Sequence, residues 1–119
     1  MEKDIREYNP VVLAFIGDAV HTLYVRESLA RTTDYKANKL HKITSGEVKA
    51  AAQAEKADRI QSLLTEAEKD IYLRARNAHT GSSAKNASIG EYKKATGFEA
   101  VIGYLYLTGQ NERLKELLK

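Results

Sequence analysis

Two long apolar segments, each interrupted by a single acidic residue, constrain the fold of this chain more than any other feature. Asp18 interrupts the apolar run over residues 11–20, and Glu99 interrupts the run over residues 95–105. A lone carboxylate in an apolar segment is costly to bury unless a cation, a metal ion or good hydrogen-bond donors meet it. The pattern therefore predicts two buried helices that bring the two acids together at a metal site.

Helix signals recur along the chain, whereas no segment shows the alternating pattern of a half-buried strand. Asn9 followed by Pro10 is a strong helix start and predicts a helix over residues 10–31. Capping boxes begin at Thr65 and Ser88. We expect further helices over residues 35–43, 47–64, 66–76, 89–108 and 111–118, with breaks at 32–34, 44–46 and 77–87, Ser45 and Asn111 as caps, and Gly109 as a stop. The prediction is an all-α fold.

Length and composition exclude several classes of protein. A chain of 119 residues is one domain by size, so we expect a single domain over residues 1–119. The absence of cysteine excludes disulfides and thiolate metal sites and fits a reducing cytosol, so we expect a cytoplasmic protein. No apolar run is long enough to span a bilayer, and the charged start does not fit a signal peptide. A net charge of +3 permits nucleic-acid binding without requiring it.

The two lone carboxylates carry the chemistry that the residues themselves suggest. Gly17 lies next to Asp18, and Gly97 and Gly103 lie near Glu99, so the two helices can approach closely. Two carboxylates with waters in the remaining positions suit Mg²⁺, which can activate water and neutralise a phosphodiester transition state. The alternative is that each acid pairs with a buried Arg or Lys. His21, one turn from Asp18, is expected to be a packed, hydrogen-bonded histidine.

Basic and polar side chains gather in two segments that suit phosphates and sugar hydroxyls. The first holds Lys36, Lys39 and Lys42, and the second holds Arg74, Arg76, Asn77, His79 and Lys85. We predict that both segments bind RNA. The alternative is a solvated helix face for the first and an ordinary polar loop for the second.

Two motifs resemble those of the ribonuclease III family. Residues 13–20, Leu-Ala-Phe-Ile-Gly-Asp-Ala-Val, resemble the family's signature helix. Residues 96–107, Thr-Gly-Phe-Glu-Ala-Val-Ile-Gly-Tyr-Leu-Tyr-Leu, resemble its second acidic motif. The opening Asn9-Pro10 and the polar loop after Arg76 narrow the resemblance to the Mini-ribonuclease III subfamily, over nearly the whole chain.

The resemblance implies a homodimeric, all-helical endonuclease domain that cleaves double-stranded RNA with Mg²⁺ held by the catalytic residues Asp18 and Glu99. It implies a dimer interface on the signature helix, through Val11, Val12, Phe15 and Ile16. It further implies a role in maturing the ends of precursor 23S ribosomal RNA, with help from a large-subunit ribosomal protein. We expect no double-stranded RNA-binding domain after residue 119, so the catalytic domain must hold the substrate alone.

The chain departs from the family's pattern at three acidic positions. Ala14 and Thr96 replace two of the four metal-binding carboxylates, and Val11 replaces a dimer-contacting Glu. The loss of these carboxylates leaves two alternative functions open. One is a catalytically weak or inactive double-stranded RNA-binding dimer, and the other is a helical protein-interaction module whose acids are structural.

Overall fold

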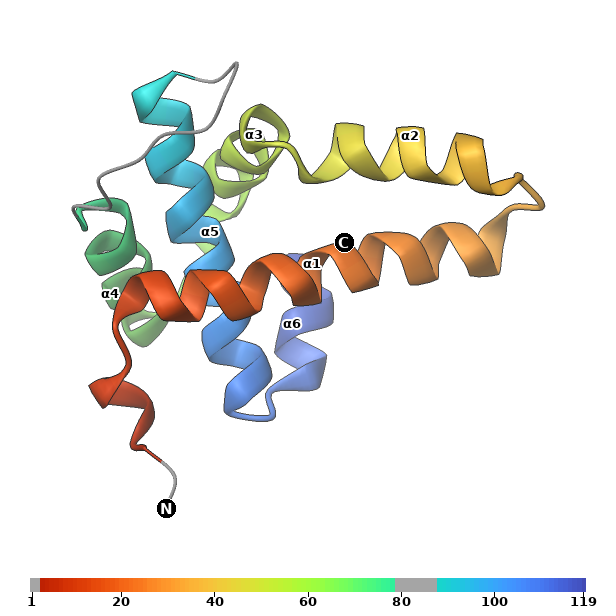
Figure 1. The fold of residues 1–119 in the computed structure, drawn as a ribbon. Coiled ribbons are helices and arrows are strands. Elements are labelled where there is room, and N and C mark those ends of the chain that lie inside the picture. Colours follow the sequence, from red (N-terminus) through yellow and green to blue (C-terminus); the bar gives the residue numbers. More distant parts are fainter. Residues whose placement is uncertain (1–2, 79–87) are drawn as a thin grey trace.

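A computed structural model describes residues 3–78 and 88–119, and every regular element in these ranges is helical (Figure 1). No described helix is both long and apolar enough to cross a membrane. The elements, in chain order, are η1 (Ile5–Glu7), α1 (Pro10–Thr32), α2 (Ala37–Val48), α3 (Ala50–Ile60), η2 (Gln61–Leu63), α4 (Glu66–Arg76), α5 (Ile89–Leu107) and α6 (Asn111–Leu117). The predicted all-α fold is confirmed.

Helices α1 and α5 form the centre of the fold and cross each other, while α3, α4 and α6 pack around α5 (Figure 1). Helix α2 runs back alongside the second half of α1. The core holds Leu13 from α1 and Phe98, Val101, Ile102 and Leu105 from α5, all fully buried. The apolar run of α5 is therefore buried, as predicted. The run of α1 is buried only in part, through Leu13, Ala14, Gly17 and Val20, while Val12 and Phe15 are exposed, so the prediction of a fully buried first helix is wrong.

Local signals in the sequence set the starts of α1, α4 and α5 and the end of α5. Asn9 Oδ1 accepts a hydrogen bond from Val11 N at 2.8 Å, and Pro10 is the first helical residue of α1. Both predicted capping boxes are formed, at Thr65 for α4 and at Ser88 for α5. Gly109 has a φ of 71°, the left-handed conformation that ends a helix at little cost for glycine. These starts and this stop are confirmed.

The predicted break at residues 44–46 is wrong, because α2 continues through it to Val48. The chain turns instead at Lys49, whose backbone is extended, and Ser45 does not cap the next helix. Thr44 is buried where α2 packs on α1, so tertiary contacts outweigh the weak helix propensity of the Thr-Ser-Gly sequence. The cap of α6 is also displaced, since Gln110 precedes the helix and Asn111 is its first residue.

Candidate active site

The crossing of α1 and α5 brings their backbones into direct contact at two glycines. A side chain at Gly17 would overlap the backbone carbonyl of Glu99, and a side chain at Gly103 would overlap that of Leu13. Only hydrogen fits at either position, so these glycines are required by close approach rather than by flexibility. The predicted approach of the two helices is confirmed, and it places Asp18 beside Glu99.

The two carboxyl groups are neighbours, so that Asp18 affects the pKa of Glu99. Asp18 is exposed, whereas Glu99 is half-buried. The pKa of Glu99 is raised from an ordinary 4.5 to about 8, mainly by burial and in addition by hydrogen bonding and charge repulsion from the adjacent Asp18. Hydrogen bonding from the Gln53 amide lowers this pKa but does not offset the rise. The site therefore disfavours two negative charges unless a cation joins them.

No such cation comes from the described part of the chain. Among residues 3–78 and 88–119, neither Asp18 nor Glu99 forms an ion pair. The buried acid Glu68 shows the contrast, because its carboxylate accepts bidentate hydrogen bonds from Arg113 at 2.8 and 2.9 Å. The alternative in which buried Arg or Lys residues neutralise the two acids is not what this structure shows.

The donor set fits a hard divalent cation with few protein ligands. Mg²⁺ commonly takes one or two carboxylates and keeps several waters, and an exposed Asp18 beside a half-buried Glu99 leaves room for these waters. No third His, Cys, Asp or Glu joins the pair within the described ranges. Ala14 is buried, and Thr96 Oγ1 donates a hydrogen bond to the backbone carbonyl of Tyr92 at 3.0 Å. The two substituted positions therefore supply no charge.

The raised pKa of Glu99 predicts that the metal-free protein loses stability as pH rises. A carboxyl whose folded pKa of about 8 exceeds its ordinary 4.5 stabilises the fold fully below pH 4.5, and this stability is lost progressively up to pH 8. Between pH 6 and pH 9 we expect a loss of about 2 kcal/mol, or about 5–10 °C in melting temperature. Thermal melting of the protein in a chelator, at pH 6 and pH 9 and matched ionic strength, measures this loss of stability.

Substitution of the carboxyl supplies the control for this pH dependence. Glu99→Gln is expected to flatten the decline between pH 6 and pH 9, whereas Glu112→Gln, at a fully exposed position of α6, should leave it intact. Mg²⁺ should restore the wild-type melting temperature at pH 9. If the metal-free wild type is as stable at pH 9 as at pH 6, the conclusion that Glu99 has a raised pKa and no neutralising partner is wrong.

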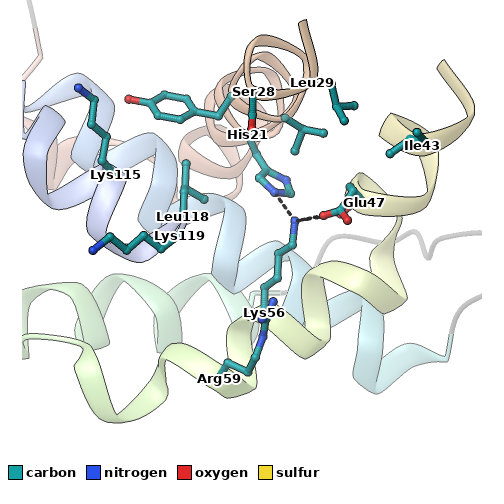
Figure 2. A pocket seen from close by; sticks show the side chains of 12 residues that line it. His21, Ser28, Leu29, Ile43, Glu47, Lys56, Arg59, Lys115, Leu118 and Lys119 are labelled. Carbon is teal, nitrogen blue, oxygen red and sulfur yellow. Dashed lines mark hydrogen bonds and ion pairs between the residues drawn. The ribbon is translucent and has the colours of Figure 1, made fainter. Parts of the chain in front are cut away.

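A buried polar cluster lies directly behind Glu99. Gln53 on α3 is 2% exposed and His21 on α1 is 1% exposed. Gln53 Nε2 lies 3.0 Å from His21 Nδ1. On the other side of the ring, Lys56 Nζ lies 2.9 Å from His21 Nε2, as Figure 2 shows. Burial, the largest cause, and the nearby Lys56 charge lower the pKa of His21 to about 4, so the ring is neutral at physiological pH. The expected packed, hydrogen-bonded histidine is confirmed, with its ring edge-to-face against Phe98.

Sequence reasoning missed Gln53. It stands alone among the alanines of residues 50–54, but an amide in an Ala-, Lys- and Glu-rich helix is an ordinary helix former. The signal that marks it is its place on the same face as Ala57 and Ile60, both buried. A polar side chain on the buried face of a helix needs a partner, as the two acids do.

The two predicted RNA-binding segments lie on different parts of the molecule. Helix α2 begins beside the far end of α1, and α4 lies at the opposite end of the molecule (Figure 1). Lys36, Lys39 and Lys42 are exposed on or just before α2, and Lys39 Nζ lies 3.8 Å from the centre of the Tyr35 ring. The structure therefore leaves these three cations accessible, though not as one patch with those on α4.

The second segment is described only in part. Arg74 and Asn77 are exposed at the end of α4, and Arg76 Nε donates a hydrogen bond to Asn77 Oδ1 at 3.2 Å. The predicted residues His79 and Lys85 lie outside the described residues. Of this segment, Arg74 and Arg76 lie in the last turn of α4, and Asn77 is the C-cap of that helix.

The four predicted interface residues divide between two environments. Val12 and Phe15 are 45% and 76% exposed, whereas Val11 and Ile16 are half-buried. Leu23, two turns beyond Phe15 on the same side of α1, is 61% exposed and was not predicted. An exposed apolar stripe therefore follows α1 past Asp18.

The chain resembles known proteins over nearly its whole length. The family model of the Ribonuclease III domain matches residues 11–110. Curated relatives named Mini-ribonuclease 3 include those of Clostridium tetani, 48% identical over 99% of this chain and 79% of the relative, and of Staphylococcus aureus, 40% identical over 98% and 89%. The crystal structure of protein FN1578 from Fusobacterium nucleatum has a TM-score of 0.89 and 35% identity, and the match covers 98% of this chain and 93% of that one.

Proposed function

Since this chain belongs to the ribonuclease III family, a family of endoribonucleases, we propose that it is a Mg²⁺-dependent homodimer that cleaves double-stranded RNA. The observation that carries the proposal is the juxtaposition of Asp18 and Glu99 without a cation from the described residues. Burial and the neighbouring Asp18 raise the pKa of Glu99 to about 8, so the site disfavours the charged carboxylate, and a divalent ion bound there would offset that cost.

In the proposed mechanism the carboxylates of Asp18 and Glu99 would hold Mg²⁺. The ion, when bound, supplies Lewis-acid activation of water and neutralises charge that develops on the scissile phosphate. Asp18 would contribute its carboxylate from an exposed position, and Glu99 would contribute its carboxylate from a half-buried one. We expect in-line attack to leave a 5′-phosphate, a 3′-hydroxyl and a short 3′ overhang, as the family resemblance implies.

The homodimer explains the exposed apolar stripe on α1. Val12, Phe15 and Leu23 expose large apolar side chains along one side of the helix that carries Asp18. Pairing the same stripe of two copies about a twofold axis removes these side chains from water and sets two active sites near one interface. Val11 and Ile16 complete the proposed interface from its half-buried edge.

Duplex RNA in this proposal is held by the catalytic domain through its cations. Dimerisation supplies two copies of each segment, so the exposed Lys36, Lys39 and Lys42 and the group formed by Arg74, Arg76, Asn77, His79 and Lys85 can contact successive phosphates. We further propose the ends of precursor 23S ribosomal RNA as the substrate, a large-subunit ribosomal protein as partner and the cytoplasm as the location, as the resemblance to the Mini-ribonuclease III subfamily implies.

Incubation of the purified protein with duplex RNA tests the proposed function. We expect the protein to cleave a duplex in millimolar Mg²⁺ and to leave the duplex intact in EDTA. We expect it not to cleave the separated single strands. A duplex copied from the paired ends of precursor 23S ribosomal RNA should be cut at fewer, defined positions than an unrelated duplex of equal length. Denaturing gels with 5′-phosphate-dependent digestion identify the new ends.

The rival functions give different outcomes in the same assay. A catalytically inactive RNA-binding dimer would retard the duplex in a native gel without cutting it at any Mg²⁺ concentration. A protein-interaction module would neither bind nor cut. Either result would overturn the proposal.

A further inference from the structure

A cavity of about 530 Å³ lies between the second half of α1, the end of α2, α3 and the end of α6 (Figure 2). On α1 it is lined by His21, Tyr24, Val25 and Ser28, which recur at helical spacing and therefore share one face of the helix. This face continues the core side of α1, but no residue of α1 after His21 is buried. The core side of this helix thus continues beyond the core and forms a wall of the cavity.

Half-buried apolar side chains from three helices and the end of the chain line part of the cavity. They are Tyr24, Val25, Leu29, Ile43 and Leu118. Each keeps part of its surface in contact with solvent, so an apolar group that enters the cavity removes this surface from water. The ring of Tyr24 can also stack on a planar heterocycle. Cavities of about 300–1,000 Å³ hold small organic ligands, so the volume suits a molecule of that size.

The charged side chains that line the cavity are mostly basic. Lys56, Arg59, Lys115 and Lys119 stand against a single acid, Glu47. Lys56 is already occupied, as Figure 2 shows, because its Nζ lies 2.9 Å from His21 Nε2, 3.0 Å from Glu47 Oε2 and 3.3 Å from the Glu47 carbonyl oxygen. These contacts use the three donors of the ammonium group. The pair formed by Lys56 and Glu47 therefore belongs to the wall, and the other three cations remain for a ligand.

These three cations have little neutralising charge near them. Within residues 3–78 and 88–119, Arg59 and Lys119 form no ion pair. Lys115 Nζ lies 3.8 Å from Glu112 Oε1, but both side chains are exposed, so this pair contributes little. Like charges around one cavity favour a ligand with several negative charges, and the guanidinium of Arg59 matches the geometry of a phosphate group.

We propose that this cavity binds a nucleoside polyphosphate, with the base against Tyr24 and the phosphates at Arg59, Lys115 and Lys119. The inference goes beyond the proposed function and does not depend on it, since neither Asp18 nor Glu99 lines the cavity. The proposed homodimer leaves the cavity open. Leu23 of the exposed stripe is two residues from both His21 and Val25, so on a helix it points about 160° away from each of them.

Calorimetric titration with ATP in EDTA tests the inference without metal or RNA. We expect one ATP to bind per chain, at least about fivefold more tightly than adenosine or inorganic tripolyphosphate, because ATP alone uses both the aromatic wall and the cations. The absence of Mg²⁺ keeps the phosphates away from the two acids of the candidate active site, whose negative charge repels them. Asp18→Asn should therefore bind ATP like the wild type.

Two variants of the lining separate the phosphate contacts from the base contact. Arg59→Gln should weaken the binding of both ATP and tripolyphosphate about tenfold, because it removes a charge-assisted hydrogen bond to phosphate. Tyr24→Leu should weaken ATP binding about fivefold or more and leave tripolyphosphate binding unchanged, because it removes only the stacking surface. Lys69→Gln removes the same charge at an exposed position of α4 and should bind both ligands like the wild type. Melting temperatures verify that each variant is folded.

Three results would overturn the inference. ATP binding that requires Mg²⁺ and is lost in Asp18→Asn would place the nucleotide at the two acids instead of in the cavity. Tripolyphosphate that binds as tightly as ATP would show that the aromatic wall contributes nothing to recognition. Failure of the wild type to bind ATP at millimolar concentration would exclude a nucleotide, and weaker binding of duplex RNA by Arg59→Gln would then assign these cations to the RNA-binding surface.

Discussion

Asp18→Asn is expected to reduce cleavage of duplex RNA by at least about 10³-fold while RNA binding is retained. The substitution keeps the shape of the side chain but removes one of the two negative charges that meet beside α5. Loss of about 4 kcal/mol of electrostatic stabilisation at a metal-assisted phosphodiester transition state corresponds to this factor. Single-turnover cleavage in Mg²⁺ measures the rate, and fluorescence anisotropy with labelled duplex in Ca²⁺ measures binding.

The matched control for Asp18→Asn removes a carboxylate that lies in an exposed ion pair rather than beside Glu99. Asp58→Asn breaks an exposed ion pair, in which Asp58 Oδ1 lies 3.0 Å from Lys94 Nζ, and should leave cleavage within about twofold of wild type. Asp18→Asn should also melt no lower than wild type in chelator, because removal of a crowding charge often stabilises a functional site. Cleavage by Asp18→Asn within threefold of wild type, or its failure to fold, would contradict the catalytic role.

The pairing of Asp18 with Glu99 could be predicted because each acid is costly where it stands. Apolar neighbours on both sides place each helix in the core, and glycines beside the acids allow the backbones to touch. Both signals lie within a few residues of the carboxylate that they explain. The same local character made the Thr65 and Ser88 caps predictable, since a capping box is complete within four residues.

What escaped prediction depends on partners far away in the sequence. The amide of Gln53 finds His21 on another helix, 32 positions away, and nothing near it in the sequence distinguishes it from a solvent-facing glutamine. The continuation of α2 through residues 44–46 has the same origin, because the contacts of Thr44 with α1 outweigh local propensity. Leu23 was missed for a further reason. Its exposure on α1 is explained only if a second copy of the chain covers it, as in the proposed homodimer.

Phe15→Glu is expected to convert the proposed homodimer into a monomer at micromolar concentration. Phe15 is the most exposed large apolar side chain of the described residues, at 76%. Burying one such side chain stabilises an interface by about 1.5–3 kcal/mol, and a twofold axis counts it twice, so the dissociation constant should rise by about 10²–10⁴. Two glutamates brought together across the axis add repulsion. Sedimentation velocity over a concentration series measures the change.

The companion variants make this expectation specific to the α1 stripe. Leu63→Glu adds the same charge at a leucine that is 54% exposed on η2, and should leave the dimer intact. Cleavage by Phe15→Glu should fall with the dimer fraction and recover as protein concentration rises, because each folded monomer keeps its own Asp18 and Glu99. Cleavage that stays low at concentrations where dimer reforms would assign Phe15 to the site itself. If the wild type sediments as a monomer at tens of micromolar, the proposed dimer interface is wrong. The exposed apolar stripe on α1 would then have to bind a different partner.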